Sequence, residues 1–468
     1  MVIEQMIEAG MAAFKKALSD WWVEGELTVD SAHVVTQGIQ AALAAAGRAA
    51  FREYLESKEI QDDVLVVDDE RYRFKYRSEK RFQTLWGPLT LTRRLYQNAP
   101  DSKTHVPLDA AWGMTGQFMT IEVREAAAYS CALMTAEETH ELLKKSALFH
   151  PHPTQIKRCV EAIGAQIAHD PLALEARLRA QETAPEGTCV LVASLDGVNV
   201  LLHDPEEKGA KRGRPAARPV TRETRASTTA YHNAMVGSVS FYGDIPPGEK
   251  TPQRLISRYV SHMPEENAPT FKAKFEAELA DAEHHVLPGT TKVMLCDGAR
   301  VLWNYIRQQE RYNDYEKLVD YCHTLEHLSL AAEALFGPGS AARTWYDKYR
   351  RILLEEDDGA CGVIRSMDYY ARKNSLSPTS HKGYEKQRTF FLRNKTLMTY
   401  TDFRGRGLPI GSGPVEAACK SLVKTRMCRS GMRWTCKGGQ NILALRTFVK
   451  SKRWDPFWNE YKDSLAAA

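Results

Sequence analysis

The chain has 468 residues, which is enough for roughly two to four domains, at least one of them with a buried sheet. Its 63 Lys+Arg residues nearly balance its 59 Asp+Glu residues, so net charge alone does not indicate a nucleic-acid partner. The 9 cysteines form no CxxC pair and no apolar run reaches about 18 residues, which argues against a zinc ribbon, a disulfide framework and a membrane span and predicts a cytoplasmic protein.

Within the first 118 residues, the spacing of apolar side chains changes from that of a helix to that of a strand. Residues 1–60 place apolar side chains at helical spacing and predict two helices. Residues 61–118 predict a β-hairpin region, with a small hairpin over 84–96 that turns at Gly87-Pro88. In this region one segment alternates strictly, which predicts a strand with four cations on one face (Arg71, Arg73, Lys75, Arg77) and three aromatic rings on the other (Tyr72, Phe74, Tyr76). Such a strand is either half of a hairpin on the core or a basic ribbon that contacts a DNA backbone.

Residues 119–185 return to a helical period. Thr135 and Thr154 are suited to cap two successive helices. These helices predict either a helix-turn-helix, whose second helix is led by Gln155, Lys157 and Arg158, or a plain helical hairpin packed on the core. In the first case the chain begins with a mainly helical DNA-binding region.

The remainder of the chain predicts a sheet interrupted by helices. Within 186–322, four apolar segments read as buried strands (189–203, 231–244, 254–263 and 291–299), and a helix is expected over 268–285. This order fits an α/β or α+β fold with a sheet of mixed direction. Residues 323–405 are helical throughout and predict an all-helical insertion. Residues 406–468 then complete the core with a glycine-rich stretch, a helix at Pro414 and basic C-terminal helices.

Three carboxylates stand out in this second half. Asp196 and Asp297 each follow an apolar strand segment and precede a glycine, which is where α/β sheets place functional carboxylates. The plain alternative for each is an Asx-turn that ends the strand. Glu416 falls in the first turn of a helix capped by Ser412 or Gly413, where the alternative is a capping-box glutamate. Together the three can bind a pair of divalent metal ions that act on a phosphodiester.

The segments around these carboxylates resemble a known family. The resemblance covers roughly residues 107–458 and rests on SLDGV at Asp196, LCDGA at Asp297, DYCHTLEHL over 320–328, and LPIGSGPVEAACKSLVKTRM over 408–427 with SGMRW up to Trp434. In these segments the chain is similar to the insertion-sequence transposases of the Kra type, which are related to the mutator-like group. The chain departs from many of these relatives because no CxxC pair precedes its PLD segment, so a zinc-stabilised end-recognition module is not expected.

The resemblance implies a fold, an activity and partners. It implies an RNase H-like catalytic domain in which Asp196, Asp297 and Glu416 form a DDE triad and bind two Mg²⁺ ions, with Mn²⁺ as a substitute. Asp320 and His323 match a signature of the family, and they either orient neighbouring groups and DNA or have a structural role. The implied reaction is cleavage and strand transfer at the ends of an insertion sequence. Double-stranded DNA, a homodimer or larger assembly, and a bacterial, nucleoid-associated location follow from the same resemblance.

Two basic segments are candidates for DNA contacts. Lys211, Arg212 and Arg214 form the core of an AT-hook-like motif or, alternatively, a solvated basic linker. Downstream of the Glu416 region, cations accumulate with no acidic residue between them: Lys420, Lys424, Arg426, Arg429, Arg433 and Lys437. Such a surface would hold a phosphate backbone, with Arg429, Arg433 and Trp434 holding or splaying the DNA end.

Two other readings of the sequence remain open. HTLEH over 323–327 matches the HxxEH string of inverted zinc metalloproteases, which predicts a zinc metallohydrolase. The second alternative keeps the fold without catalysis, as a silent or domesticated DNA-binding relative. The retention of all three carboxylates favours an active enzyme over this alternative.

Overall fold

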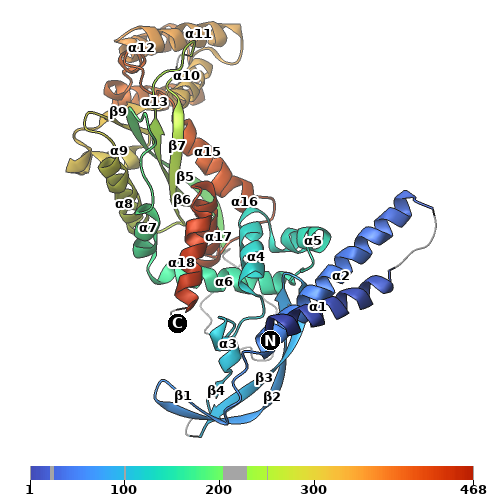
Figure 1. The fold of residues 1–468 in the computed structure, drawn as a ribbon. Coiled ribbons are helices and arrows are strands. Elements are labelled where there is room, and N and C mark those ends of the chain that lie inside the picture. The colour runs from blue at the N-terminus through green and yellow to red at the C-terminus, as the bar shows by residue number, and fades with distance from the viewer. Residues whose placement is uncertain (1, 22–25, 100–101, 204–228, 250, 467–468) are drawn as a thin grey trace, which may run out of the picture. The chain divides into compact units, whose positions relative to one another are not determined.

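The computed structural model describes residues 2–21, 26–99, 102–203, 229–249 and 251–466. The chain forms two compact units, unit 1 of residues 1–166 with 455–468, and unit 2 of residues 167–454 (Figure 1). None of the helices in the described ranges is long and apolar enough to cross a membrane. The sequence analysis starts the sheet-containing core at residue 186 and assigns 455–468 to it. In the structure, unit 2 starts at residue 167, and residues 455–468 belong to unit 1.

Unit 1 begins with two antiparallel helices, as predicted: α1 (Val2–Ser19) and α2 (Val29–Glu56). Thr28 and Ser31 form a capping box at the start of α2. Trp21 packs directly on Gly38, where an added Cβ would lie 2.4 Å from the Cβ of Trp21. A glycine is therefore required at this helix contact.

The hairpin region of unit 1 is a four-stranded antiparallel sheet. Its strands, in spatial order, are β1 (Val64–Val67), β2 (Glu70–Thr84), β3 (Gly87–Asn98) and β4 (Thr104–His105). The β2–β3 turn is at Leu85-Trp86, because Gly87 and Pro88 already pair in β3. The predicted turn at Gly87-Pro88 is therefore wrong by two residues, and the hairpin is longer than predicted.

A bulge divides the basic stripe of β2. The register with β3 shifts between Phe74 and Tyr76, so that Arg73 lies opposite Gln97 but Tyr76 lies opposite Leu95. Directly opposed residues share a face, and Gln97 and Leu95 are on one face of β3. Arg73 therefore shares a face with Tyr76, and Arg77 is on the other face. The prediction of four cations on one face is wrong, since alternation in sequence cannot show a bulge.

The other helices of unit 1 lie where helices were predicted, except for the short helix at 107–111, which falls in the region predicted as a β-hairpin. They are α3 (Pro107–Ala111), α4 (Ile121–Leu133), α5 (Ala136–Ser146), α6 (Pro153–His169) and α18 (Trp454–Ala466). Lys157 at the start of α6 bonds to Glu137 of α5 at 2.7 Å. The Gln166 amide of α6 donates to the Ser464 hydroxyl of α18. The helix-turn-helix reading of α5 and α6 stays a prediction.

Unit 2 contains the predicted sheet of mixed direction. Its strands are β5 (Val190–His203), β6 (Thr229–Tyr242), β7 (Arg254–His262), β8 (Thr291–Cys296) and β9 (Glu316–Val319). The spatial order is β7-β6-β5-β8-β9, in which β5, β8 and β9 run parallel and the other pairs are antiparallel. The four predicted strands and the 268–285 helix are confirmed, and β9 is an additional strand.

Helices cover both faces of this sheet. On one side lie α8 (Pro269–His285) and α9 (Arg300–Gln308), and on the other lie α15 (Gly413–Ala418) and α17 (Cys436–Lys450) (Figure 1). The first side buries large aromatic side chains in the core of unit 2, among them Trp303 and Phe275, which packs on Gly237 of β6. The second packs Val415 and Leu443 against the distal half of β5. The strands therefore consist of nearly continuous apolar runs because helices bury both faces of the sheet.

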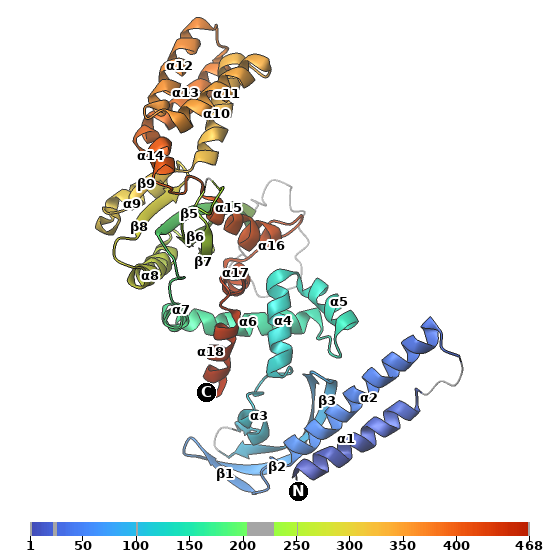
Figure 2. The same ribbon diagram turned by 45° about the horizontal axis from the view of Figure 1, so that its top comes forward.

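The predicted helical insertion is present between β9 and α15. It contains α10 (Tyr321–Phe336), α11 (Ser340–Glu355), α12 (Gly359–Lys373), α13 (Pro378–Asn394) and α14 (Tyr400–Gly405). Figure 2 shows α10–α13 packed side by side. Tyr400 anchors the end of the insertion to the sheet, since its hydroxyl bonds to the Val319 carbonyl at 3.0 Å and to Thr324 at 2.7 Å.

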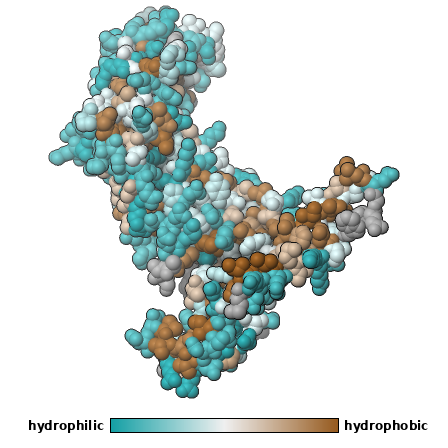
Figure 3. Space-filling model, viewed as in Figure 1, coloured by the Kyte–Doolittle hydropathy of each residue, from teal (hydrophilic) through white to brown (hydrophobic). Residues whose placement is uncertain are grey.

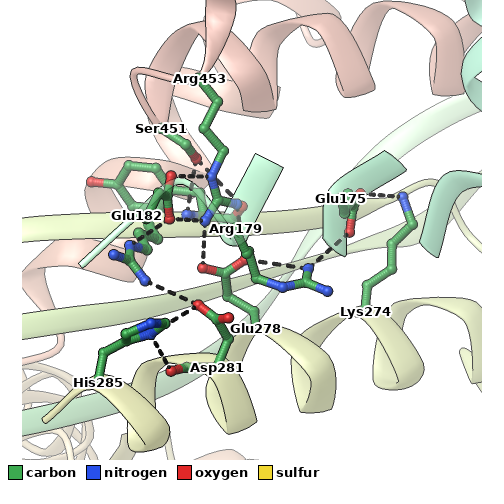
Figure 4. Close-up of polar contacts among 11 residues, drawn as sticks. Glu175, Arg179, Glu182, Lys274, Glu278, Asp281, His285, Ser451 and Arg453 are labelled. Atoms are coloured by element: carbon green, nitrogen blue, oxygen red, sulfur yellow. Dashed lines mark hydrogen bonds and ion pairs between the residues drawn. The ribbon is translucent and has the colours of Figure 1, made fainter. Parts of the chain in front are cut away.

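A buried group of charges ties α7 (Pro171–Arg179) and the following loop to unit 2 (Figure 4). Arg453 makes paired hydrogen bonds of 2.6–2.8 Å to both Glu182 and Glu278. Lys274 of α8 bonds to Glu175 of α7 at 2.8 Å. These contacts explain why the second unit starts before residue 186, since they bind 167–185 to α8 and to the end of α17.

Candidate active site

Asp196 lies inside β5, not at its end. It is opposite Val236 of β6, and β5 continues to His203. The parallel pairing with β8 stops earlier, at Ala193 and Met294. The prediction that the strand ends at Asp196 is therefore wrong. The pairing of β5 with β8 does end before Asp196, because β5 extends beyond its neighbour. Asp196 accepts the Gly197 N–H at 2.6 Å and the Cys419 thiol at 3.2 Å.

Asp297 directly follows the last residue of β8, as predicted. Its Oδ1 accepts the N–H of Ala299 at 3.0 Å, which is an Asx-turn contact. Gly298 does not have a positive φ. A Cβ there would lie 2.2 Å from the Cε2 atom of Phe390 of α13. The glycine after Asp297 is therefore required by close packing of the insertion.

Glu416 lies in the first turn of α15, where the sequence places it. The Ser412 hydroxyl lies 3.4 Å from its Oε1 atom. A capping-box glutamate would accept the backbone N–H of the N-cap residue, but the N–H of Ser412 donates to Asp320 instead. Glu416 is therefore not engaged in capping its own helix.

Asp320 connects the elements that carry the other carboxylates. Its side chain is fully buried, and Oδ1 accepts the His323 N–H at 2.6 Å, which caps α10. Oδ2 accepts the N–H of Ser412, immediately before α15. Its own N–H donates to the carbonyl of Cys296, the residue before Asp297, at 2.8 Å. Asp320 is thus a positioning residue that ties β8, α10 and the Glu416 helix together.

All three predicted carboxylates line one pocket of about 870 Å³. Its walls also include His323, Glu326, Ser412, Cys419, Lys420, Lys424 and Thr425. In the described part of the chain, no cationic side chain pairs with Asp196, Asp297 or Glu416. The pocket therefore gathers negative charge without a matching ion pair.

The electrostatics of the pocket reflect this imbalance. Lost hydration raises the pKa of the Asp297 carboxyl, and the charge of Asp196 raises it further. Lost hydration also raises the pKa of Glu416, with Asp320 and Asp196 as further causes. A divalent cation would reverse these effects, because it stabilises the ionised carboxylates.

The donor set fits a hard divalent ion in its chemistry, since Mg²⁺ and Mn²⁺ prefer carboxylate oxygens. Within the described ranges, however, no three His, Cys, Asp or Glu side chains are already placed to hold a metal ion. The three carboxylates would have to rotate toward one another on binding. Each oxygen of Asp196 accepts one hydrogen bond, from Gly197 and from Cys419, and keeps a further lone pair for a cation.

A π-helix follows the Glu416 turn and shapes one wall of the pocket. It spans Cys419–Lys424 and leads into α16 (Thr425–Met427). A π-turn leaves carbonyls without their usual helical partners. The buried Arg446 of α17 donates to two of them, with an Nε contact to Leu422 at 2.6 Å and an Nη2 contact to Ser421. Sequence reasoning missed Arg446, whose only signal was a cation within an apolar helix.

The predicted DNA contacts differ in their placement. Lys420 and Lys424 are exposed and line the pocket, and Arg429 and Arg433 are exposed beyond it. Arg426 is buried, with its guanidinium 5.2 Å from the centre of the Trp434 ring. The AT-hook-like residues Lys211, Arg212 and Arg214 lie outside the described residues.

Trp434 has a structural environment. It forms a β-bridge with Leu202 at the end of β5, and its indole N–H donates to the Met427 carbonyl at 2.9 Å. Its ring packs against the buried side chains between β5 and the helices α15 and α17, which include Val415 and Leu443. Arg426 and Trp434 were both predicted as DNA contacts, but the structure packs them against each other where the chain that follows α16 returns to β5.

The HTLEH string is divided between two environments. His323 lines the carboxylate pocket, with its Nδ1 3.5 Å from Glu326. His327 stacks on Phe390 with ring centroids 3.5 Å apart, and its Nδ1 is 2.6 Å from the Gln387 amide oxygen. His327 is thus engaged with α13, which does not favour the zinc reading.

No protein-family model matches the sequence, and no curated protein matches it. Among solved structures, the chain is similar to one from the Drosophila P element transposase strand transfer complex, at 10% identity and a TM-score of 0.25. The similarity covers 74% of this chain and 81% of that chain. At this TM-score the likeness carries no argument about activity.

Proposed function

We propose that this protein is a DDE transposase that cuts DNA at the ends of an insertion sequence and joins the freed ends to target DNA. The observation that carries the proposal is the shared pocket of Asp196, Asp297 and Glu416, three carboxylates from separate elements without an ion-pair partner. Such a group is costly for the fold unless it binds a cation. The family resemblance of the segments that contain these residues supports the same activity.

The roles of the residues follow from their positions. Asp196 and Asp297, held on neighbouring parallel strands, and Glu416 on α15 would bind two divalent ions, Mg²⁺ or Mn²⁺. Ions bound there would activate the attacking oxygen and stabilise the leaving oxygen of a phosphodiester. Asp320 would hold Glu416 in place through the N–H of Ser412. His323, at the pocket wall, would face the phosphate that is cut.

DNA would reach the pocket along its basic edge. Lys420 and Lys424 are exposed beside the carboxylates, so a phosphate backbone can be held next to the catalytic groups. Arg429, Arg433 and Lys437 extend this exposed surface. The predicted partners are therefore double-stranded transposon ends and target DNA.

The test compares wild type with Glu416→Gln on a supercoiled plasmid that carries the native ends of the element, in Mg²⁺ or Mn²⁺. Glu333→Gln is the matched control, because Glu333 is exposed on α10 away from the pocket residues and loses the same charge. We expect cleavage and joining by wild type and Glu333→Gln, and a loss of at least about 100-fold in Glu416→Gln, the scale for removal of one group that stabilises transition-state charge.

A second readout separates metal binding from catalysis. Titration of Mn²⁺ by calorimetry should show binding to wild type and much weaker binding to Glu416→Gln. Equal cleavage by wild type and Glu416→Gln would remove Glu416 from the site. DNA binding without cleavage by wild type would instead favour a catalytically silent DNA-binding relative.

A further inference from the structure

Helix α13 of the insertion packs against two elements that line the carboxylate pocket. The face of the insertion shown in Figure 3 is mostly hydrophilic, and Phe390 of α13 belongs to the core beneath it. Its ring stacks on His327 of α10 and lies 6.2 Å from the ring of His323, which lines the pocket. The same ring lies against Gly298, the residue after Asp297. Helix α13 therefore connects α10 to the turn that carries Asp297.

Asn394 presents a polar group to the same turn. It is four residues after Phe390, so the two side chains lie on one side of α13. A Cβ added at Gly298 would lie 2.2 Å from Cε2 of Phe390 and 2.9 Å from the amide nitrogen of Asn394. Asn394 is only 1% exposed. The insertion thus holds a buried side-chain amide beside the residue that follows Asp297.

The amide nitrogen of Asn394 has no hydrogen-bond acceptor among the described residues. A buried N–H group without an acceptor is destabilising, so its presence in a fold requires a reason. Asp297 has the complementary deficit. Its Oδ1 accepts the N–H of Ala299, but no group in the described ranges donates to its Oδ2. A buried donor without an acceptor and a carboxylate with a free oxygen therefore border one turn.

We infer that Asn394 is a positioning residue for Asp297, whose carboxylate accepts a hydrogen bond from the Asn394 amide when it turns to bind a divalent cation. This inference rests on the proposed function, because it assigns a further residue to the same metal-binding site. A neutral donor fixes the orientation of a metal-binding carboxylate and leaves its charge to the metal. A cationic side chain in the same place would compete with the metal for that charge.

The test measures Mn²⁺ binding by the full chain with calorimetry. Asn394→Leu keeps a side chain of similar shape and removes both polar atoms. We expect its Mn²⁺ dissociation constant to rise about 10–100-fold, the range for residues that orient a metal ligand. Without metal, urea denaturation should show that Asn394→Leu is at least as stable as wild type, because the variant removes an unsatisfied buried donor. A purely structural asparagine would give the reverse, with lower stability and unchanged Mn²⁺ affinity.

Asn441→Leu in α17 is the matched control. Asn441 is also buried and its amide nitrogen also lacks an acceptor among the described residues, but it does not line the pocket. We expect this control to bind Mn²⁺ as tightly as wild type. If leucine disturbs the end of α13, Asn394→Ala only removes atoms and suits a helix, and we expect it to weaken Mn²⁺ binding at least about tenfold.

The outcomes separate this inference from the proposed function. Wild-type Mn²⁺ affinity in a folded Asn394→Ala or Asn394→Leu would overturn the role of Asn394, as would an equal loss of affinity in the Asn441→Leu control. The proposed function would survive either result if Glu416→Gln still binds Mn²⁺ more weakly than wild type in the same assay. A wild-type chain that binds no Mn²⁺ would overturn both.

Discussion

Unit 2 holds two groups of charged side chains that differ in balance. In the buried group of Figure 4, four cations (Arg179, Arg258, Lys274, Arg453) meet four carboxylates (Glu175, Glu182, Glu278, Asp281). In the candidate active site, Asp196, Asp297 and Glu416 meet no cationic side chain among the described residues. The fold thus pairs every carboxylate of one set with a cation and leaves the other set without an ion-pair partner among the described residues.

The difference separates a structural role from a chemical one. A buried, balanced network stabilises the arrangement of the elements that supply it, and removal of one partner leaves a buried charge alone. An unbalanced pocket is destabilising by itself, which makes its carboxylates candidates for a role that needs the charge. Four changes would break or sharpen this contrast.

The largest expected effect on stability is in the balanced group. Arg453→Met leaves Glu182 and Glu278 without their shared guanidinium, and we expect a loss of about 3–5 kcal/mol in the free energy of unfolding. Arg406→Met is the control, because Arg406 also pairs with two carboxylates but is exposed, and its loss should cost about 0–1 kcal/mol. Urea denaturation measures both, and equal effects would contradict the structural reading of Figure 4.

The opposite result is expected in the unbalanced pocket. Asp297→Asn removes a carboxylate whose pKa is raised by lost hydration and by Asp196, so the metal-free variant should melt at a higher temperature than wild type at neutral pH. Its DNA cleavage should fall by at least about 100-fold. A variant that is both less stable and inactive would instead give Asp297 a structural role.

Asp320 lies between the two cases, because it is buried and accepts hydrogen bonds from the backbone of His323 and Ser412, which line the pocket. In Asp320→Asn, the side-chain amide NH₂ would face a backbone N–H donor, that of either His323 or Ser412. Because two donors then meet, we expect the free energy of unfolding to fall by about 1–3 kcal/mol. Activity should fall about 10–100-fold, as for other residues that orient a metal ligand. A raised Mn²⁺ dissociation constant in the folded variant would show that the effect passes through the metal ligands. Unchanged Mn²⁺ binding would limit Asp320 to the fold.

The smallest effect concerns pH. Because the pKa values of Asp297 and Glu416 are raised in the folded chain, their protonated forms favour folding below their ordinary values of 3.8 and 4.5. This stability is lost as pH rises through the raised folded-state values. Without metal, Asp297→Asn should therefore have nearly the same melting temperature as wild type at about pH 4. Its melting temperature should exceed that of wild type by a growing margin as the pH rises to about 7.5. Mg²⁺ should reduce this difference in melting temperature, because it stabilises wild type near neutral pH. A difference that does not change with pH would contradict the raised pKa values.

The sequence by itself determined the order and type of most elements. The apolar runs of 189–203 and 291–299 identified β5 and β8, and the 3.6-residue period predicted an all-helical insertion over 323–405, because these patterns record which side of an element is buried. It also singled out Asp196, Asp297 and Glu416, since polar residues that interrupt or border such patterns are visible locally.

The tertiary structure decided what depends on residues distant in sequence. The bulge that divides the basic stripe of β2 arises from its register with β3. The position of Asp196 beyond the β5–β8 pairing depends on the length of a neighbouring strand. Arg446 supports a π-helix about 25 residues earlier in the chain. Burial, register and charge balance are set by contacts across the fold, which local periodicity does not encode.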